Sequence, residues 1–170
     1  MATSELHSFV TGPLIVKLKT DITDMRIFNR SDLHAAAYFH IRRLLLVRAG
    51  WMCRTDPENP AGPASLVLTL NNEFQGLAHF EFLLRPKASS CFPADELDER
   101  MARLRKALAA RERDQPGRAY LVGVFDTAES WFYPEEPRWQ KQSCQWVPIN
   151  CHAFPRHDEW RSRWEKLAVS

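Results

Sequence analysis

The sequence has little of what marks a membrane protein, a secreted protein or a disulfide-rich protein. Its apolar runs are short, such as the four residues 44–47, whereas a membrane-spanning helix needs about 20. The chain opens without a basic region followed by an apolar stretch, so we expect no signal peptide. Its four cysteines are scattered and form no CxxC pair, which favours reduced thiols in a cytoplasmic protein that does not contact a membrane.

The chain also lacks a large excess of charge of one sign. The formal net charge is +2, which is too small to argue by itself for a nucleic-acid partner. The chain carries no glycine-rich phosphate loop with its lysine and no nucleophile elbow. None of these motifs therefore assigns a function.

The amino-acid composition is that of a globular protein. Of the 170 residues, 45% are apolar and 26% are charged, which is typical of one domain with its own core, spanning residues 1–170. Five of the six tryptophans lie in the last quarter of the chain. We therefore expect the segment 128–170 to pack onto the body of the domain.

The spacing of apolar residues predicts three helices. They cover residues 32–49, 94–113 and 158–167. Ser31 fits the N-cap of the first helix, and Gly50 fits the position just past its end.

Strand patterns lie between these helices. Residues 65–70 and 77–84 predict an antiparallel hairpin, 119–125 a buried strand and 146–153 a last strand, while 14–19 read as a short edge strand. A hairpin followed by a helical crossover predicts an α/β fold with a mixed sheet of four to six strands and helices on its faces. The residues expected to be buried are Leu66, Leu68, Phe80, Phe82, Leu97, Leu104, Leu121, Val122 and Val124.

The order of these elements carries a resemblance. A helix over residues 31–43 is followed by a Gly50–Trp51 turn, two strands, an amphipathic helix and a strand over 120–125. This order, spanning residues 30–127, resembles the PD-(D/E)XK nuclease superfamily. The resemblance implies a restriction-endonuclease-like fold, in which helices flank a central mixed sheet.

That family uses a divalent ion, held by two carboxylates, to activate water for phosphodiester cleavage, with a lysine beside them. The resemblance places the second carboxylate at Glu81. It places Leu83 where the family has the lysine, and Ser65 where the family has the first carboxylate. It therefore implies a degenerate member without a cofactor, in which Glu81 is a remnant paired with Arg54 or Arg85.

The alternative is an active Mg²⁺-dependent DNA endonuclease with a rearranged site. Asp56 or Glu58 would then join Glu81 as a metal ligand, and Lys87 would replace the lost lysine.

Basic residues gather on two of the predicted helices and after the hairpin. They are Arg42, Arg43, Arg85, Lys87, Arg103 and Lys106. Basic helix faces suit contacts with a phosphate backbone. The alternative is a solvated helix face with pairs such as Glu99–Arg103.

A group of aromatic residues lies among prolines and charged residues near the C-terminus. It includes Trp131, Tyr133, Trp139 and Trp146. These side chains are either anchors of a protein interface or a cover for the sheet.

Four residues near the C-terminus have side chains that can bind a metal. Cys144, Cys151, His152 and His157 match no standard zinc spacing, so buried thiols and surface histidines are the favoured interpretation.

The sequence therefore leads to a hypothesis of a degenerate nuclease fold. The resemblance implies a subunit or binding module of a bacterial nucleic-acid-processing or defence complex. Its partner would be a protein, a second copy of the chain or a nucleic acid.

Overall fold

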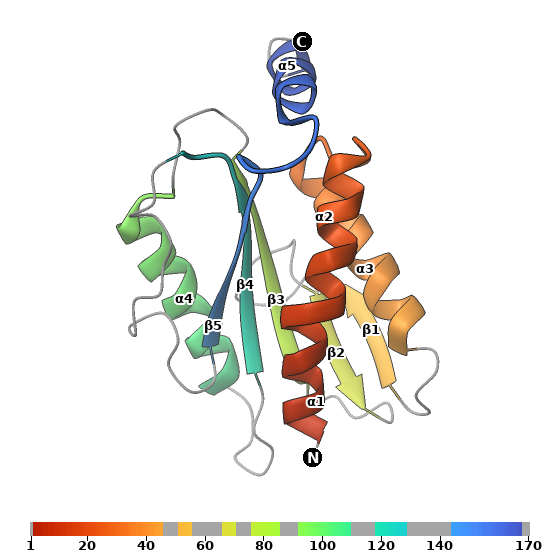
Figure 1. Ribbon diagram of the computed structural model, residues 1–170. Coiled ribbons are helices and arrows are strands. Elements are labelled where there is room, and N and C mark those ends of the chain that lie inside the picture. Colours follow the sequence, from red (N-terminus) through yellow and green to blue (C-terminus); the bar gives the residue numbers. More distant parts are fainter. Residues whose placement is uncertain are drawn as a thin grey trace.

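The computed structural model describes residues 2–45, 51–55, 66–70, 76–85, 92–109, 118–128 and 144–167. Figure 1 shows the elements in chain order. The helical elements are α1 (Ala2–Phe9), η1 (Val10–Leu14), α2 (Ile15–Thr23), α3 (Arg30–Leu45), α4 (Ala94–Ala109) and α5 (His157–Leu167). The strands are β1 (Trp51–Thr55), β2 (Leu66–Leu70), β3 (Gly76–Arg85), β4 (Arg118–Phe125) and β5 (Cys144–Asn150).

The strands form one mixed sheet in the order β1-β2-β3-β4-β5. Strands β1, β2 and β3 are antiparallel neighbours, whereas β4 is parallel to β3 and β5 is parallel to β4. Helix α4 makes the crossover from β3 to β4, as a parallel pair requires. The predicted α/β class, the mixed sheet and the hairpin are confirmed.

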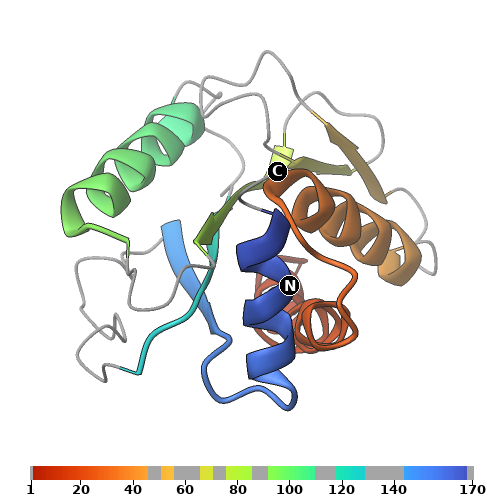
Figure 2. The same ribbon diagram turned by 90° about the horizontal axis from the view of Figure 1, so that it is seen from above.

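Helices cover both faces of the sheet. Figure 2 shows α4 alone on one face and α1, α2 and α3 on the other. Helix α5 lies beyond the edge at which β3, β4 and β5 end, close to α2 (Figure 1). Because both faces are covered, successive side chains of the central strands enter two different hydrophobic clusters.

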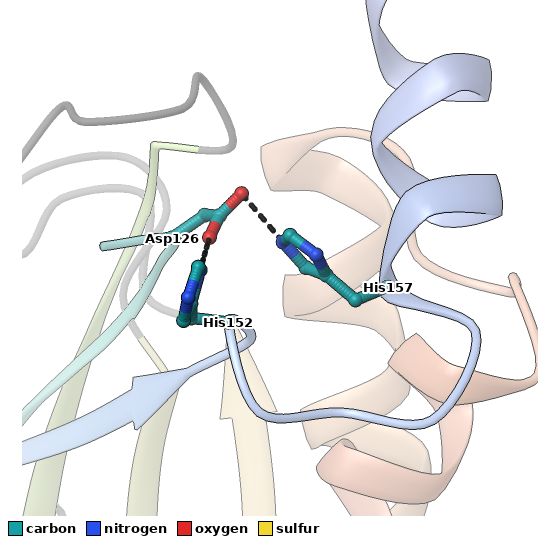
Figure 3. Close-up of side chains that lie close together, drawn as sticks. All are labelled: Asp126, His152 and His157. Carbon is teal, nitrogen blue, oxygen red and sulfur yellow. Dashed lines mark hydrogen bonds and ion pairs between the residues drawn. The ribbon is translucent and has the colours of Figure 1, made fainter. Parts of the chain in front are cut away.

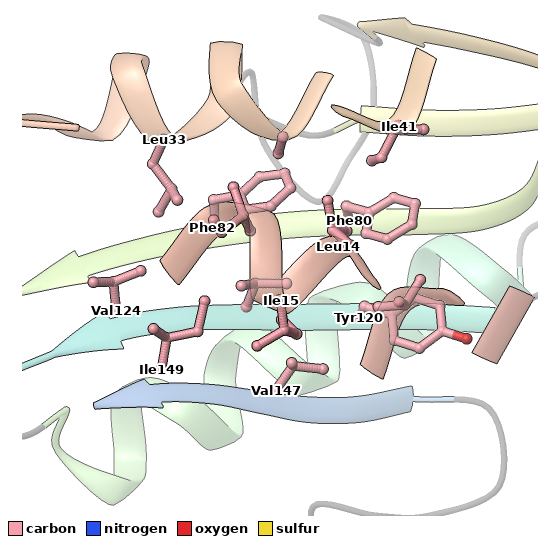
Figure 4. Close-up of a cluster of buried hydrophobic side chains, with 14 of the residues drawn as sticks. Leu14, Ile15, Leu33, Ile41, Phe80, Phe82, Tyr120, Val124, Val147 and Ile149 are labelled. Carbon is pink, nitrogen blue, oxygen red and sulfur yellow. The ribbon is translucent and has the colours of Figure 1, made fainter. Parts of the chain in front are cut away.

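The larger cluster lies between the sheet and the helices α1 to α3. Phe80 and Phe82 of β3 pack there with Leu33 and Ile41 of α3 (Figure 4). The smaller cluster lies under α4 and includes Leu83, Leu97 and Leu121. All the residues predicted to be buried are so, apart from Leu68, whose side chain lies outside the described part.

The N-terminal segment corrects one prediction. Residues 14–19 are not an edge strand but part of a helical run through α1, η1 and α2. The buried positions Val10, Leu14, Leu18 and Ile22 recur every fourth residue, which is a helical period. Pro13 lies inside the wide π-helical turn η1, and such a turn accommodates a residue that donates no backbone hydrogen bond.

Helix α3 begins slightly earlier than predicted. The Asp32 carboxylate accepts backbone hydrogen bonds from Phe28 (2.9 Å) and Asn29 (3.2 Å), and the Asn29 side chain accepts one from the Asp32 backbone (2.8 Å). This reciprocal arrangement is a capping box. Asn29, rather than Ser31, is therefore the N-cap.

No described helix has the length and apolarity that crossing a membrane requires.

The segment 128–170 contributes β5 and α5, and Trp160 of α5 is buried in the larger cluster. Trp146 of β5 is buried in the smaller cluster, where it contacts Phe92 edge-on and stacks on Phe125. Of the two alternatives for this aromatic group, Trp146 therefore fits the cover for the sheet and not the interface anchor. Trp131, Tyr133 and Trp139 lie outside the described residues.

The packing of Trp146 depends on a glycine in β4. A Cβ atom added at Gly123 would lie 2.1 Å from one ring carbon of Trp146 and 2.6 Å from another. We therefore expect Gly123→Ala to lower the free energy of unfolding by about 1–3 kcal/mol through overpacking. Urea unfolding of the two proteins measures the difference.

Gly12 provides the matched control, since nothing lies within 4 Å of a Cβ added there. Gly12→Ala should leave stability unchanged or raise it by up to about 1 kcal/mol, because glycine disfavours a helix. Equal effects of the two substitutions would contradict the packing argument.

Candidate functional site

Glu81 lies in the middle of β3, on the face covered by α4. Its side chain is fully buried, and it pairs across the sheet with Leu121 of β4. On its other side, β2 begins at Leu66, which is opposite Phe80. The sheet thus holds Glu81 beside the start of β2, which is the position that the resemblance implies for the second carboxylate.

Two arginines from opposite layers reach this carboxylate. Arg100 of α4 donates a hydrogen bond of 2.5 Å to Glu81 Oε1. An Arg30 guanidinium nitrogen, from the first residue of α3, lies 3.8 Å from the same oxygen. The predicted ion pair of Glu81 exists, but its partners are Arg100 and Arg30.

Arg85, one of the two predicted partners, instead pairs with Glu96 of α4 and lies over the ring of Phe92. The side chain of Arg54, the other predicted partner, lies outside the described part. Arg100 lies four residues after Glu96 on α4, so the two side chains share one helix face, with Arg100 3.8 Å from Glu96.

These contacts belong to a larger group, which we term the arginine cluster: Arg30, Arg85, Arg100 and Arg103. Arg103 follows Arg100 by one turn of α4 and lies 3.5 Å from Glu99. The four side chains are 20–40% exposed, so that solvent reaches the cluster while Glu81 beneath it is fully buried. The sequence pointed to Arg85 and Arg103 but missed Arg30 and Arg100.

Burial and neighbouring charges shift the pKa values of Glu81 and Arg30 in this cluster. Burial raises the pKa of Glu81 above its ordinary value, against the opposing effects of Arg100, Arg103 and Arg30. Burial, followed by repulsion from Arg100, lowers the pKa of Arg30. Glu81 Oε2 and the Nε atoms of these three arginines are buried and make no hydrogen bond among the described residues.

The other predicted basic residues do not join this cluster. Arg42 and Arg43 are exposed near the end of α3, on the opposite side of the sheet from Lys106 of α4 (Figure 2). Asp56, Glu58, Ser65 and Lys87 lie outside the described residues.

Among the described residues, the surroundings of Glu81 do not fit a divalent cation. Mg²⁺ prefers a shell of oxygen ligands, and here guanidinium groups contact the one buried carboxylate. A cation at Oε1 would be repelled by the same arginines that now neutralise it. Leu83, at the position of the family's lysine, is buried and apolar.

A second polar cluster lies at the edge where the parallel strands end. Asp126 follows β4 and is fully buried, and His152 and His157 each direct a ring nitrogen at it (Figure 3). His152 Nδ1 lies 3.2 Å from Asp126 Oδ1, and His157 Nε2 lies 2.8 Å from Asp126 Oδ2. Arg161 of α5 donates to Asp126 Oδ2 from Nε at 3.1 Å and from a terminal nitrogen at 2.8 Å.

Backbone contacts fix the segment that carries His152. The Asn150 side chain donates to the Thr127 carbonyl at 2.9 Å and accepts from the His152 backbone at 3.1 Å. The Cys151 backbone donates to the Phe125 carbonyl at 2.8 Å. The chain after β5 is thus tied to the chain after β4, which brings His152 to Asp126.

This grouping differs from the zinc ligands weighed in the sequence. The two histidines do come together, but their third neighbour is Asp126. Cys144 is buried in the smaller cluster under α4, and burial raises the pKa of the Cys151 thiol. The sequence analysis missed Asp126; a polar residue directly after the buried strand 119–125 was the available signal.

Comparisons of the chain with protein-family models, curated proteins and solved structures found no match. The function is therefore argued from the chain's own residues.

The Asp126 carboxylate should make stability depend on pH. Burial alone would raise the pKa of Asp126, but hydrogen bonds from Arg161 and His157 outweigh it and hold the pKa below its ordinary value. An acid with a lowered folded-state pKa stabilises the fold above its unfolded pKa of about 3.9, and this contribution is lost as the pH falls further.

The measurement is the free energy of unfolding of the wild type and of Asp126→Asn from pH 7 to pH 2.5. We expect a cost of about 2–4 kcal/mol at pH 7, because the substitution leaves Arg161 without its buried partner. The cost should shrink below about pH 4. Glu165→Gln, at an exposed position of α5, is the control; a cost for Asp126→Asn that grows in acid would refute the assignment.

Proposed function

We propose that this chain is a binding module of the PD-(D/E)XK nuclease-like type that holds phosphate groups of a nucleic acid at the arginine cluster and does not cleave them with a metal ion. The observation that carries the proposal is the convergence of Arg30 and Arg100 on the buried Glu81.

The topology supports the nuclease-like part of the proposal. Helix α3, the antiparallel hairpin β2–β3, helix α4 and the parallel strand β4 follow one another in the order that the resemblance implies. Strand β1 is an additional element that the resemblance does not imply, and it begins at Trp51, where a turn was expected. Glu81 lies on the second strand of the hairpin, beside the start of the first.

The charges of the cluster support binding of an anion. Its four guanidinium groups face Glu81, Glu96 and Glu99, and the last of these is largely exposed, so that its charge is screened. The Nε atoms of Arg30, Arg100 and Arg103 are buried, so the donors that an oxygen-rich ligand would meet are on the solvent-exposed parts of these side chains. Arginine donors match the geometry of phosphate oxygens.

The same contacts weigh against cleavage. A catalytic carboxylate in this family must be free to hold a cation, whereas Oε1 of Glu81 lies against Arg100 and Arg30. Leu83 can neither carry charge nor move a proton. The proposed role is therefore recognition, as a subunit of a nucleic-acid-processing or defence complex with a protein partner or a second copy of the chain.

Removal of single arginines tests the phosphate contacts. Arg103→Ala and Arg30→Ala should weaken binding of nucleic acids of any sequence, and each should reduce the slope of log affinity against log salt concentration by about 1. Fluorescence anisotropy with labelled single- and double-stranded DNA and RNA measures both quantities. Arg163→Ala, at an exposed position of α5, is the matched control and should change neither. An unaltered salt slope in both cluster variants would refute the site.

Glu81→Gln separates recognition from catalysis. It removes the negative charge beneath the arginines while keeping the shape of the side chain, so we expect nucleic-acid affinity to rise by a factor of a few, roughly the effect of 1 kcal/mol. No cleavage is expected from either protein in the presence of Mg²⁺ or Mn²⁺. Cleavage by the wild type that disappears in Glu81→Gln would instead establish the active endonuclease and overturn the proposal.

A further inference from the structure

Asp126, His152 and His157 bring one carboxylate oxygen and two imidazole nitrogens to within 4.8 Å of one another. They come from three separate places in the chain: the end of β4, the turn after β5 and the first residue of α5. The rings of the two histidines lie 5.1 Å apart, edge to face, on either side of the Asp126 carboxylate (Figure 3).

We propose that these three side chains form a binding site for a divalent transition-metal ion such as Zn²⁺. Two nitrogens and one carboxylate oxygen are a donor set that zinc accepts in sites with three protein ligands and one open position. This site is separate from the arginine cluster, and it does not depend on the proposed function.

The spacing of the donor atoms suits such an ion. Ligands about 2.0–2.1 Å from a tetrahedral zinc ion lie roughly 3.3 Å from one another. His152 Nδ1 already lies 3.2 Å from Asp126 Oδ1, so an ion between them needs little movement. His157 Nε2 now lies 2.8 Å from the other oxygen, Oδ2, and all the donor atoms lie within 4.8 Å of one another, so His157 is the ligand that must move toward the ion. The ion would replace the protons that now bridge these atoms.

Contacts that hold the proposed ligands in place are already present. Asn150 fixes the backbone of His152, and Asp126 is fully buried. Arg161 donates to Asp126 Oδ2, as the hydrogen-bond donors that orient metal-bound carboxylates do, while Oδ1 faces His152. The His152 side chain is 43% exposed, which leaves one side of the site open to an entering ion and to a water ligand.

Arg161 is the feature that opposes a cation here. Its terminal nitrogen lies 3.2 Å from His157 Nε2 as well as 2.8 Å from Asp126 Oδ2. A second positive charge at this distance lowers metal affinity. Removing Arg161 should therefore strengthen metal binding, a result that is not expected if the cluster only stabilises the fold.

The experiment titrates the untagged full chain with ZnCl₂ by calorimetry and by competition with a chromophoric chelator. We expect one zinc ion per chain. His152→Ala should weaken binding by about tenfold or more, because it removes a ligand. Arg161→Met should strengthen binding. Thermal unfolding without metal checks that each variant is folded, and zinc should raise the unfolding temperature of the wild type more than that of His152→Ala.

Cys151→Ser is the matched control for thiolate ligation, since Cys151 adjoins His152. It should bind zinc as the wild type does. The proposal is overturned if the wild type does not bind zinc, if His152→Ala binds it equally well, or if Cys151→Ser loses affinity as much as His152→Ala does.

Discussion

A charged side chain in the middle of a sheet that is covered on both faces must find its counter-charge in one of the covering helices. Glu81 is that side chain, and Arg100 of α4 supplies most of the counter-charge. Leaving a buried charge without its partner costs about 3–5 kcal/mol, which is comparable to much of a small domain's net stability. The buried stripe of Leu97, Met101 and Leu104 turns one face of α4 toward the sheet. The Glu81–Arg100 pair adds a specific contact between this helix and β3, on which the arginine cluster depends.

Much of the fold could be predicted because burial imposes periodicity. Residues 119–125 are apolar on both sides, as a strand covered on both faces must be, and the stripe through Leu97 and Leu104 has the spacing of a helix. The prediction failed at residues 14–19, where a short run was judged by itself. Its period becomes visible only when Val10 and Ile22 are included, since the helical run continues through Gly12 and Pro13 in a π-helical turn.

The sites were harder to predict, since they join residues that are distant in the chain. Glu81 was identified through the resemblance, but its partners are 19 positions away on α4 and 51 positions away on α3. No local pattern distinguishes Arg100 from its neighbours Arg103 and Arg105. Likewise, Asp126 and His157 are 31 positions apart. Their contact depends on β4 and β5 being parallel neighbours, which places the ends of both strands at one edge of the sheet.

Both sites are governed by how arginine contacts a carboxylate. At Glu81, both arginines approach Oε1, and Oε2 is buried without a hydrogen-bond partner among the described residues. The partly exposed guanidinium groups lie on the solvent side of the buried carboxylate, which is why we propose an anionic ligand there. At Asp126, Arg161 and His157 engage Oδ2, while among the described residues His152, which is half-exposed, lies beside Oδ1. An ion that enters from the solvent side can meet this oxygen and the imidazole together, which is why we propose a cation there. The two proposals differ because in one case guanidinium groups lie between the carboxylate and solvent, and in the other an imidazole does.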